Sequence, residues 1–275
     1  MALPFVISDG VLIATQATLV ALPRTQPPAQ LSRLARAGWA VVPAASIGLV
    51  IASIALAPGT ADFLTWLALV ATPPLAALAL AAIVPGARPV WALAVPPLLA
   101  IAWATPDGSL ARDASSLALT ALGCVTLGWL LAAVAPLRLL KLGIVAAAVL
   151  DSVLVFGNLL QGPNATLNAA APAVHLPQLQ FVSFGSAVMG YGDLFIAAVL
   201  GGVLLLERTP QVPVALVCFI FAATWDLLFF VRSELPATVP VALALLASEA
   251  WRRRRPQTVQ LYPAASSLSR SSSPT

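Results

Sequence analysis

Long apolar runs, separated by short polar or proline-containing segments, dominate the chain. A helix needs about 20 apolar residues to cross the hydrocarbon core of a bilayer, and shorter runs are tolerated within a bundle. The pattern predicts nine membrane-spanning helices, of which the fourth is the weakest because it is short and contains Pro96 and Pro97. The predicted spans are approximately 4–23, 38–57, 62–84, 89–105, 114–135, 139–160, 181–206, 211–231 and 235–251.

The composition excludes a soluble globular domain. Of the 275 residues, 60% are hydrophobic and 9% charged, and the mean hydropathy is +0.96. We therefore expect an all-α polytopic membrane protein in a lipid bilayer, with a single transmembrane domain over residues 1–251. Residues 252–275 begin with four arginines and become rich in Ser and Pro, which predicts a disordered tail near anionic lipid. Cys124 and Cys218 lie within apolar runs and are expected to be small buried residues.

The basic residues predict the topology. The pI of about 9.8 would suggest nucleic-acid binding in a soluble domain, but here the arginines follow the ends of apolar runs. With nine spans, one side of the membrane collects all of the 14 Lys and Arg residues except Arg112 and Arg232. Because short cytoplasmic loops are enriched in Lys and Arg, the N-terminus is expected outside and the C-terminus in the cytoplasm. Residues Met1–Asp9 carry no basic group, so no cleavable signal peptide is expected.

Two aspartates occupy predicted spans, where an ionisable side chain usually has a function because its insertion costs about 2.5–3.5 kcal/mol. At 1.5 Å per residue, Asp151 lies roughly 20 Å beyond Arg138, and Asp193 lies roughly 21 Å before Glu207. The sixth and seventh spans are consecutive and are expected to pack side by side. Two carboxyl groups at matching depth can share one proton, so that one activates a water as base while the other donates to a carbonyl.

The other acids are expected near the ends of spans, in water or beside a basic partner. Asp226 should lie nearer the outer edge, either hydrated or paired with Arg232. Glu249 lies beside the arginine cluster and is expected to be paired or hydrated. The external loop 161–180 holds His175, expected on the surface, and the glycosylation triplet that begins at Asn164. The acids expected in water near the outer ends of spans are Asp9, Asp62, Asp107, Asp113 and Glu234.

The last four predicted spans resemble the intramembrane aspartyl proteases, the family of presenilin and signal peptide peptidase. The motif Gly190-Tyr191-Gly192-Asp193 is similar to the family's Gly-x-Gly-Asp, and Asp151 takes the place of the aspartate one span earlier. Leu235-Pro236-Ala237-Thr238 resembles the family's Pro-Ala-Leu element, which implies a role in shaping the active site and engaging substrate. By this resemblance, Asp151 and Asp193 are the catalytic residues, and no cofactor or metal is required.

Two positions depart from the family pattern. Leu150 stands where the family usually has Tyr, and Thr238 stands where the triplet ends in Leu. These departures should affect positioning, substrate preference and inhibitor sensitivity rather than the acids themselves. The predicted orientation is similar to that of signal peptide peptidase, which implies substrates with cytoplasmic N-termini, including signal-peptide-like transmembrane helices.

Other mechanisms of intramembrane proteolysis lack the necessary residues. One histidine cannot complete a His-Glu-x-x-His metal site, and a Ser–His pair would need His175 outside the bundle. A prepilin-type peptidase would have a lysine soon after the motif, whereas Leu194 and Phe195 follow here. Outside the enzymes, the chain could be a proton-coupled transporter that uses Asp151, Asp193 and Asp226, or a catalytically silent relative that binds membrane proteins. Homo-oligomers and complexes with accessory subunits are both compatible with the sequence.

Overall fold

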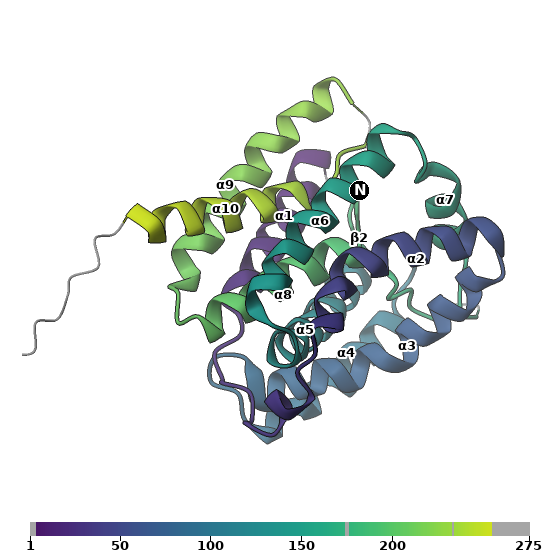
Figure 1. The fold of residues 1–275 in the computed structure, drawn as a ribbon. Helices are drawn as coiled ribbons and strands as arrows, with labels where there is room; N and C mark the ends of the chain where they lie inside the picture. The colour runs from purple at the N-terminus through teal and green to yellow at the C-terminus, as the bar shows by residue number, and fades with distance from the viewer. Residues whose placement is uncertain (1–3, 174–175, 233, 255–275) are drawn as a thin grey trace, which may run out of the picture.

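The computed structural model describes residues 4–173, 176–232 and 234–254, and this part of the chain is mostly helical (Figure 1). The helices pack into one bundle, and one short hairpin precedes α8. The elements are α1 Phe5–Ala21, α2 Val42–Leu56, α3 Thr60–Leu78, α4 Val95–Ala104, α5 Leu110–Val134, α6 Leu137–Phe156, α7 Gln161–Ala169, β1 Phe181–Phe184, β2 Ala187–Gly190, α8 Tyr191–Leu206, α9 Gln211–Trp225 and α10 Val239–Arg254.

Each predicted span coincides at least in part with a helix, and the protein is a multi-pass membrane protein. In the described ranges, five helical stretches are long and apolar enough to cross a bilayer by themselves: Ala37–Leu56, Thr60–Ile83, Leu110–Val134, Leu137–Phe156 and Gln211–Phe230. Shorter apolar helices are Phe5–Ala21, Pro89–Ala104 and Tyr191–Leu206. The number of nine crossings and the side on which each terminus lies stay predictions.

The expectation that the chain is entirely helical was wrong at residues 181–190, which form β1 and β2 instead of the start of a span. Aromatic and β-branched residues in Phe181-Val182-Ser183-Phe184 favour an extended strand. The strands are antiparallel, with Phe181 opposite Gly190 and Phe184 opposite Ala187. Gly185 begins the two-residue turn with a φ of +59°, a conformation that glycine adopts without strain. The predicted external loop also contains a helix, α7.

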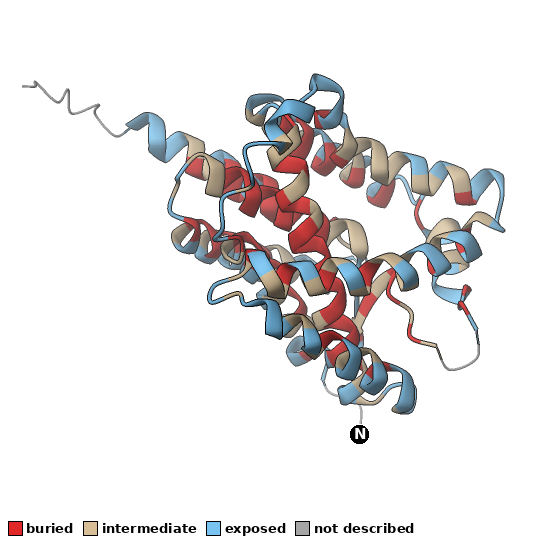
Figure 2. Cartoon of the chain, turned by 90° about the horizontal axis from the view of Figure 1, so that it is seen from below, coloured by how far each residue is buried: buried red, intermediate tan, exposed pale blue. Residues whose placement is uncertain are grey.

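Helix α8 lies at the centre of the bundle, and every residue from Leu194 to Leu204 is buried. It is apolar on all sides, as expected for a helix surrounded by other helices. Glycines allow its closest contacts: a Cβ added to Gly128 of α5 would lie 2.4 Å from the carbonyl carbon of Ala198. Figure 2 shows the buried residues concentrated in these inner helices. The backbone of α8 from Leu194 onward is therefore held by neighbours on several sides.

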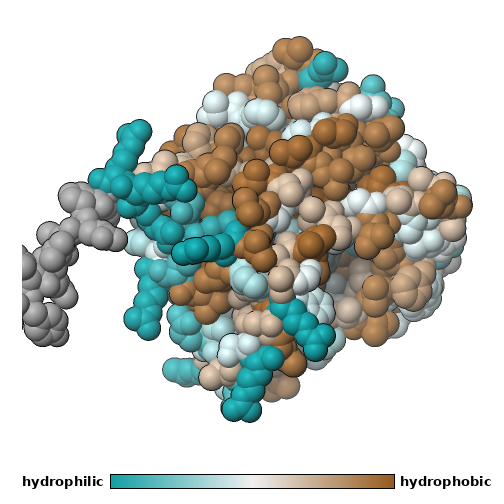
Figure 3. Space-filling model, viewed as in Figure 1, coloured by the Kyte–Doolittle hydropathy of each residue, from teal (hydrophilic) through white to brown (hydrophobic). Residues whose placement is uncertain are grey.

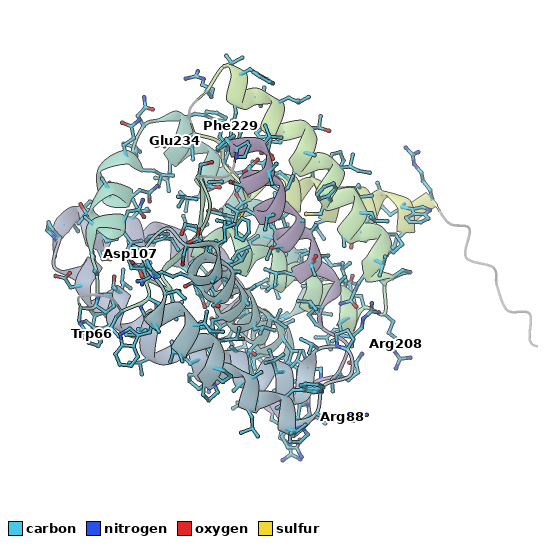
Figure 4. All side chains as sticks on the ribbon, turned by 180° about the vertical axis from the view of Figure 1, so that it is seen from behind. Trp66, Arg88, Asp107, Arg208, Phe229 and Glu234 are labelled. Atoms are coloured by element: carbon cyan, nitrogen blue, oxygen red, sulfur yellow. The ribbon has the colours of Figure 1, made fainter. Side chains whose placement is uncertain are left out.

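The outside of the bundle is apolar, which agrees with a lipid environment. Large side chains such as Leu49, Phe63, Leu142 and Phe230 are more than 60% exposed, which is unusual for a soluble monomer. Figure 3 shows hydrophobic residues over most of one face and hydrophilic residues gathered at the end where α10 leaves the bundle. In Figure 4, Arg88 and Arg208 lie towards one end of the bundle, while Asp107 and Glu234 lie towards the other.

Candidate functional site

Asp151 lies in the last third of α6 and is buried, with 7% of its surface exposed. Its Oδ2 accepts a hydrogen bond from the hydroxyl of Thr238 at 2.6 Å and a longer one from the Thr238 N–H at 3.4 Å. Thr238 comes directly before α10 and is completely buried. A carboxylate removed from water needs such donors, and here the segment before α10 supplies them.

Asp193 lies in the first turn of α8, and the prediction of a position within the interior of a helix was wrong. The β hairpin replaces the first part of the predicted span, so the helix begins only at Tyr191. The Asp193 Oδ2 accepts a hydrogen bond at 3.1 Å from the N–H of Gly190, the last residue of β2. An acidic residue in this position stabilises a helix start, because the first N–H groups of a helix have no partner within it.

The structure packs the two helices that carry Asp151 and Asp193 against each other. Asp151 is buried and Asp193 is partly buried, and the two carboxyl groups are near enough to influence each other electrostatically. Each accepts a hydrogen bond of its own, Asp151 from Thr238 and Asp193 from Gly190. Two acids coupled in this way can share protonation.

The motif residues before Asp193 have different surroundings. A Cβ on Gly190 would lie 3.0 Å from the Asp193 Oδ2, so the carboxyl group reaches the Gly190 N–H closely because that residue is glycine. A Cβ on Gly192 would meet only Ile47 of α2, at 3.8 Å. The carbonyl of Tyr191 lies 3.9 Å from the Cys124 sulfur. The close backbone approach expected at this motif is therefore seen at Gly190. At Gly192, an added Cβ would have no neighbour nearer than Ile47.

The segment Leu235-Pro236-Ala237-Thr238 precedes α10 rather than beginning it. Pro236 and Thr238 are buried, and Leu235 and Ala237 are partly buried. Thr238, one of the two departures from the family pattern, supplies the hydroxyl that bonds Asp151. At the other departure, Leu150 packs close to Gly48 of α2, where it lies 3.4 Å from the position of an added Cβ.

Gln16 of α1 reaches the same place and carried no signal in the sequence. It is 1% exposed, and its Nε2 donates to the Ala237 carbonyl at 2.9 Å and to the Asp193 carbonyl at 3.4 Å. These partners are 221 and 177 residues away along the chain. The sequence could have marked this glutamine as a buried polar group in an apolar helix. It could not have identified the two carbonyls that the side chain contacts.

Asp113 of α5 was expected in water and is buried, so that expectation was wrong. Its Oδ2 accepts from the N–H of Gly185 at 2.9 Å, and its Oδ1 lies 3.5 Å from the Ser183 hydroxyl. Ser8 of α1 accepts from the N–H of Ser186 at 3.2 Å. Two helices thus hold the turn of the hairpin that leads into Gly190 and Asp193.

Replacing Asp113 by Ala is expected to destabilise the folded protein by about 1–3 kcal/mol, because the Gly185 N–H loses its acceptor. Asp113→Asn keeps an acceptor oxygen and should cost less. Thermal unfolding in one detergent at one pH measures both variants against the unmodified protein. Equal melting temperatures for the Ala and Asn variants would contradict a structural role for this hydrogen bond.

The other polar residues lie away from this pair. Asp9 of α1 and Asp226 are both partly buried and lie near each other, and the expected hydration of these acids stays a prediction. None of the ion pairs in the described part of the chain joins Asp226 to Arg232. Glu249 is paired, as predicted: Lys141 bridges Glu207 and Glu249, and Arg252 contacts the same two acids. His175 and residues 255–275 lie outside the described residues, and Asn164 lies in α7.

The described residues contain no group of three or more His, Cys, Asp or Glu side chains that could hold a metal ion. Cys124 and Cys218 are buried and free, as the sequence predicted. The arrangement at this site is a pair of acids within electrostatic reach of each other in an apolar bundle, with Asp151 held by Thr238 and Asp193 held by Gly190. Comparisons of the chain with protein-family models, with curated proteins and with solved structures found no match.

Proposed function

We propose that the protein is an intramembrane aspartyl endopeptidase that hydrolyses peptide bonds within transmembrane helices, with Asp151 and Asp193 as its catalytic residues. The observation that carries the proposal is that the packing of α6 against α8 brings two acids, the buried Asp151 and the partly buried Asp193, within range of electrostatic interaction. An acid pair in an apolar bundle without a permanent counter-charge is costly, and such pairs are typical of active sites.

The pair can perform both steps of peptide hydrolysis by proton transfer alone. The ionised carboxylate takes a proton from water while the water oxygen bonds to the substrate carbonyl carbon, and the protonated partner donates its proton to the carbonyl oxygen. The tetrahedral diol then returns one hydroxyl proton to the carboxylate that donated, and the C–N bond breaks. The departing nitrogen receives the proton first taken from water. One acid and one amine are formed, and the pair returns to its starting protonation.

A helical substrate must unwind before its carbonyl can be attacked, and exposed backbone beside the acids can stabilise the unwound strand. The sequence pointed to residues 234–238 for such pairing. The Ala237 carbonyl and the Thr238 N–H already have partners, which leaves the earlier part of this segment. Strand β2 offers a second edge: it ends at Gly190, and its pairing in the described chain is with β1 alone.

The proposed substrates are signal-peptide-like or otherwise type II oriented transmembrane peptides. This part of the proposal rests on the distribution of Lys and Arg in the sequence, which favours an N-terminus outside. The test is hydrolysis of a fluorescently labelled transmembrane peptide by the purified protein in lipid vesicles, with the peptide inserted in either direction. Cleavage of both orientations at equal rates would contradict the substrate class, and no cleavage of either would contradict the enzyme.

A second candidate, proton-coupled transport, is favoured by the other acid pair. Asp9 and Asp226 lie near each other and are both partly buried, and Asp9 lies on the same helix as Gln16, which contacts the backbone of Asp193. Carboxyl groups in series are typical of proton relays. Vesicles loaded with a pH-sensitive dye distinguish the candidates. Proton flux that is lost in Asp226→Asn, without peptide cleavage by the unmodified protein, would favour transport.

Replacing Gly192 by Leu is expected to leave the fold intact and to lower peptide turnover about 100-fold. The fold has room, since an added Cβ meets nothing nearer than Ile47 at 3.8 Å, but the larger side chain occupies space next to Asp193 that a substrate needs. Turnover in vesicles and thermal unfolding measure the two effects. Gly162→Leu in α7 is the control, because a Cβ added there meets no neighbour within 4 Å and the residue lies outside the proposed active site. Unchanged turnover in Gly192→Leu would place the substrate elsewhere.

A further inference from the structure

Gln16 connects the two halves of the acid pair through one nitrogen atom. Its Nε2 donates at 2.9 Å to the carbonyl of Ala237, and the next residue, Thr238, holds the Asp151 carboxylate with its hydroxyl and N–H. The same Nε2 donates at 3.4 Å to the carbonyl of Asp193 itself. The backbone that supports one acid and the backbone that carries the other are thus joined by a single side chain.

Apart from these two hydrogen bonds, the Gln16 amide lies on an apolar face of α1. Its neighbours along the buried face of α1, Leu12, Ile13, Leu19 and Val20, are apolar and belong to the main core cluster. Burying an amide among them is unfavourable unless its hydrogen bonds are made. The Ala237 carbonyl lies in a segment without helical structure, where it depends on a partner from another element.

We infer that Gln16 is a positioning residue that sets the spacing of the Asp151 and Asp193 carboxyl groups by tying the segment before α10 to the first turn of α8. The inference rests on the proposed hydrolysis by this pair. Acid–base catalysis requires both groups within hydrogen-bond reach of one water and one carbonyl, and an error of about 1 Å can cost 100-fold in rate.

The chain provides a matched control in Gln211, at the start of α9. Its Nε2 also donates to two carbonyls, those of Pro23 at 2.9 Å and Gly201 at 3.0 Å, and it is 5% exposed. Gln211 therefore joins the residues after α1 to α8. In the same way, Gln16 joins α8 to the segment before α10. Gly201 lies roughly 12 Å further along α8 than Asp193, so this second clamp is remote from the acids.

The experiment compares Gln16→Met with Gln211→Met, because methionine keeps the length and volume of glutamine and removes the amide. We expect kcat for a transmembrane peptide to fall about 10- to 100-fold in Gln16→Met with KM changed less than about threefold. Binding of a hydroxyl-containing peptide isostere, which needs both carboxyl groups, should weaken by the same factor. In Gln211→Met, both kcat and isostere binding should stay within about threefold of the unmodified protein. This should hold even if the melting temperature falls by the same amount as in Gln16→Met. Equal losses in the two variants would overturn the inference.

A second measurement separates this inference from the proposed function. Melting temperatures of Gln16→Met, Thr238→Val and the double variant should be non-additive, because both residues hold the same segment, whereas Gln211→Met and Thr238→Val should add. Additive shifts for the first pair would overturn the inference whether or not the protein cleaves peptides. If Gln16→Met does not fold, Gln16→Glu is used in both measurements. Glutamate keeps the length of the side chain, and its protonated carboxyl group donates one hydrogen bond at most. If kcat of Gln16→Glu equals that of the unmodified protein, the inference is again overturned.

Discussion

Asp193→Asn and Asp151→Asn are each expected to lower the rate of peptide hydrolysis at least about 1,000-fold. An amide has the size of the carboxyl group but neither accepts nor releases the proton that each step transfers, and general acid–base catalysis contributes about 10²–10⁴-fold for one group. The fold should persist. In Asp151→Asn, the oxygen of the new amide can still accept from Thr238, and in Asp193→Asn, the first turn of α8 remains packed between α1, α5 and α6.

The measurement is single-turnover cleavage of a labelled transmembrane peptide in vesicles, with thermal unfolding of the same preparations. Asp226→Asn is the control, because it removes a carboxyl group that is also partly buried in an apolar part of the chain, lies near Asp9 and is outside the proposed active site. Its turnover should stay within about threefold. Full hydrolysis by either Asp151→Asn or Asp193→Asn would refute the two-aspartate mechanism.

Thr238→Val is expected to lower kcat/KM by about 10- to 100-fold. The substitution keeps the shape of the side chain and removes the hydroxyl that donates to Asp151 at 2.6 Å, so only the longer bond from the backbone N–H remains. A hydrogen bond to a charged group contributes about 1.5–3 kcal/mol, and each 1.4 kcal/mol corresponds to a factor of about ten in rate. Thr238→Ser should restore most of the activity because it returns the hydroxyl.

The control for this prediction is Thr65→Val in α3. Thr65 is also completely buried, but its hydroxyl bonds the Ala61 carbonyl of its own helix and is not part of the acid pair. Thr65→Val should therefore change stability without changing kcat/KM. If Thr238→Val and Thr65→Val have the same kcat/KM as the unmodified protein, the Thr238 hydroxyl has no part in orienting Asp151.

The apolar pattern located the apolar helices, because a bilayer imposes a minimum length and excludes unpaired backbone groups, but it did not predict α7 in the loop. It also failed at residues 181–190, which are apolar but form a hairpin. Hydropathy measures how well a residue tolerates a dry environment and does not separate a buried strand from a buried helix. The aromatic and β-branched residues of β1 and Gly185 were the signal for a turn and two strands, within a run interpreted as one helix.

Within the site, the sequence pointed to the two acids and to the segment before α10, since charged groups and prolines in apolar runs are conspicuous. It assigned Asp113 to water because the residue lies near the end of a span. The structure instead uses this acid to hold the hairpin turn. Position along a helix gives depth in the bundle, but burial also depends on what folds back over the helix end, and here β1 and its turn cover it.

The sequence by itself determined the apolar, mostly helical character of the protein, because this follows from local composition. The matching depth of Asp151 and Asp193, calculated from the fixed rise of a helix, stays a prediction. Only the tertiary structure decided which side chains meet. Gln16 from the first helix, Gly190 from the hairpin and Thr238 before the last helix converge on the two acids. Contacts between residues so far apart in the sequence depend on how the helices rotate and pack, which no local pattern encodes.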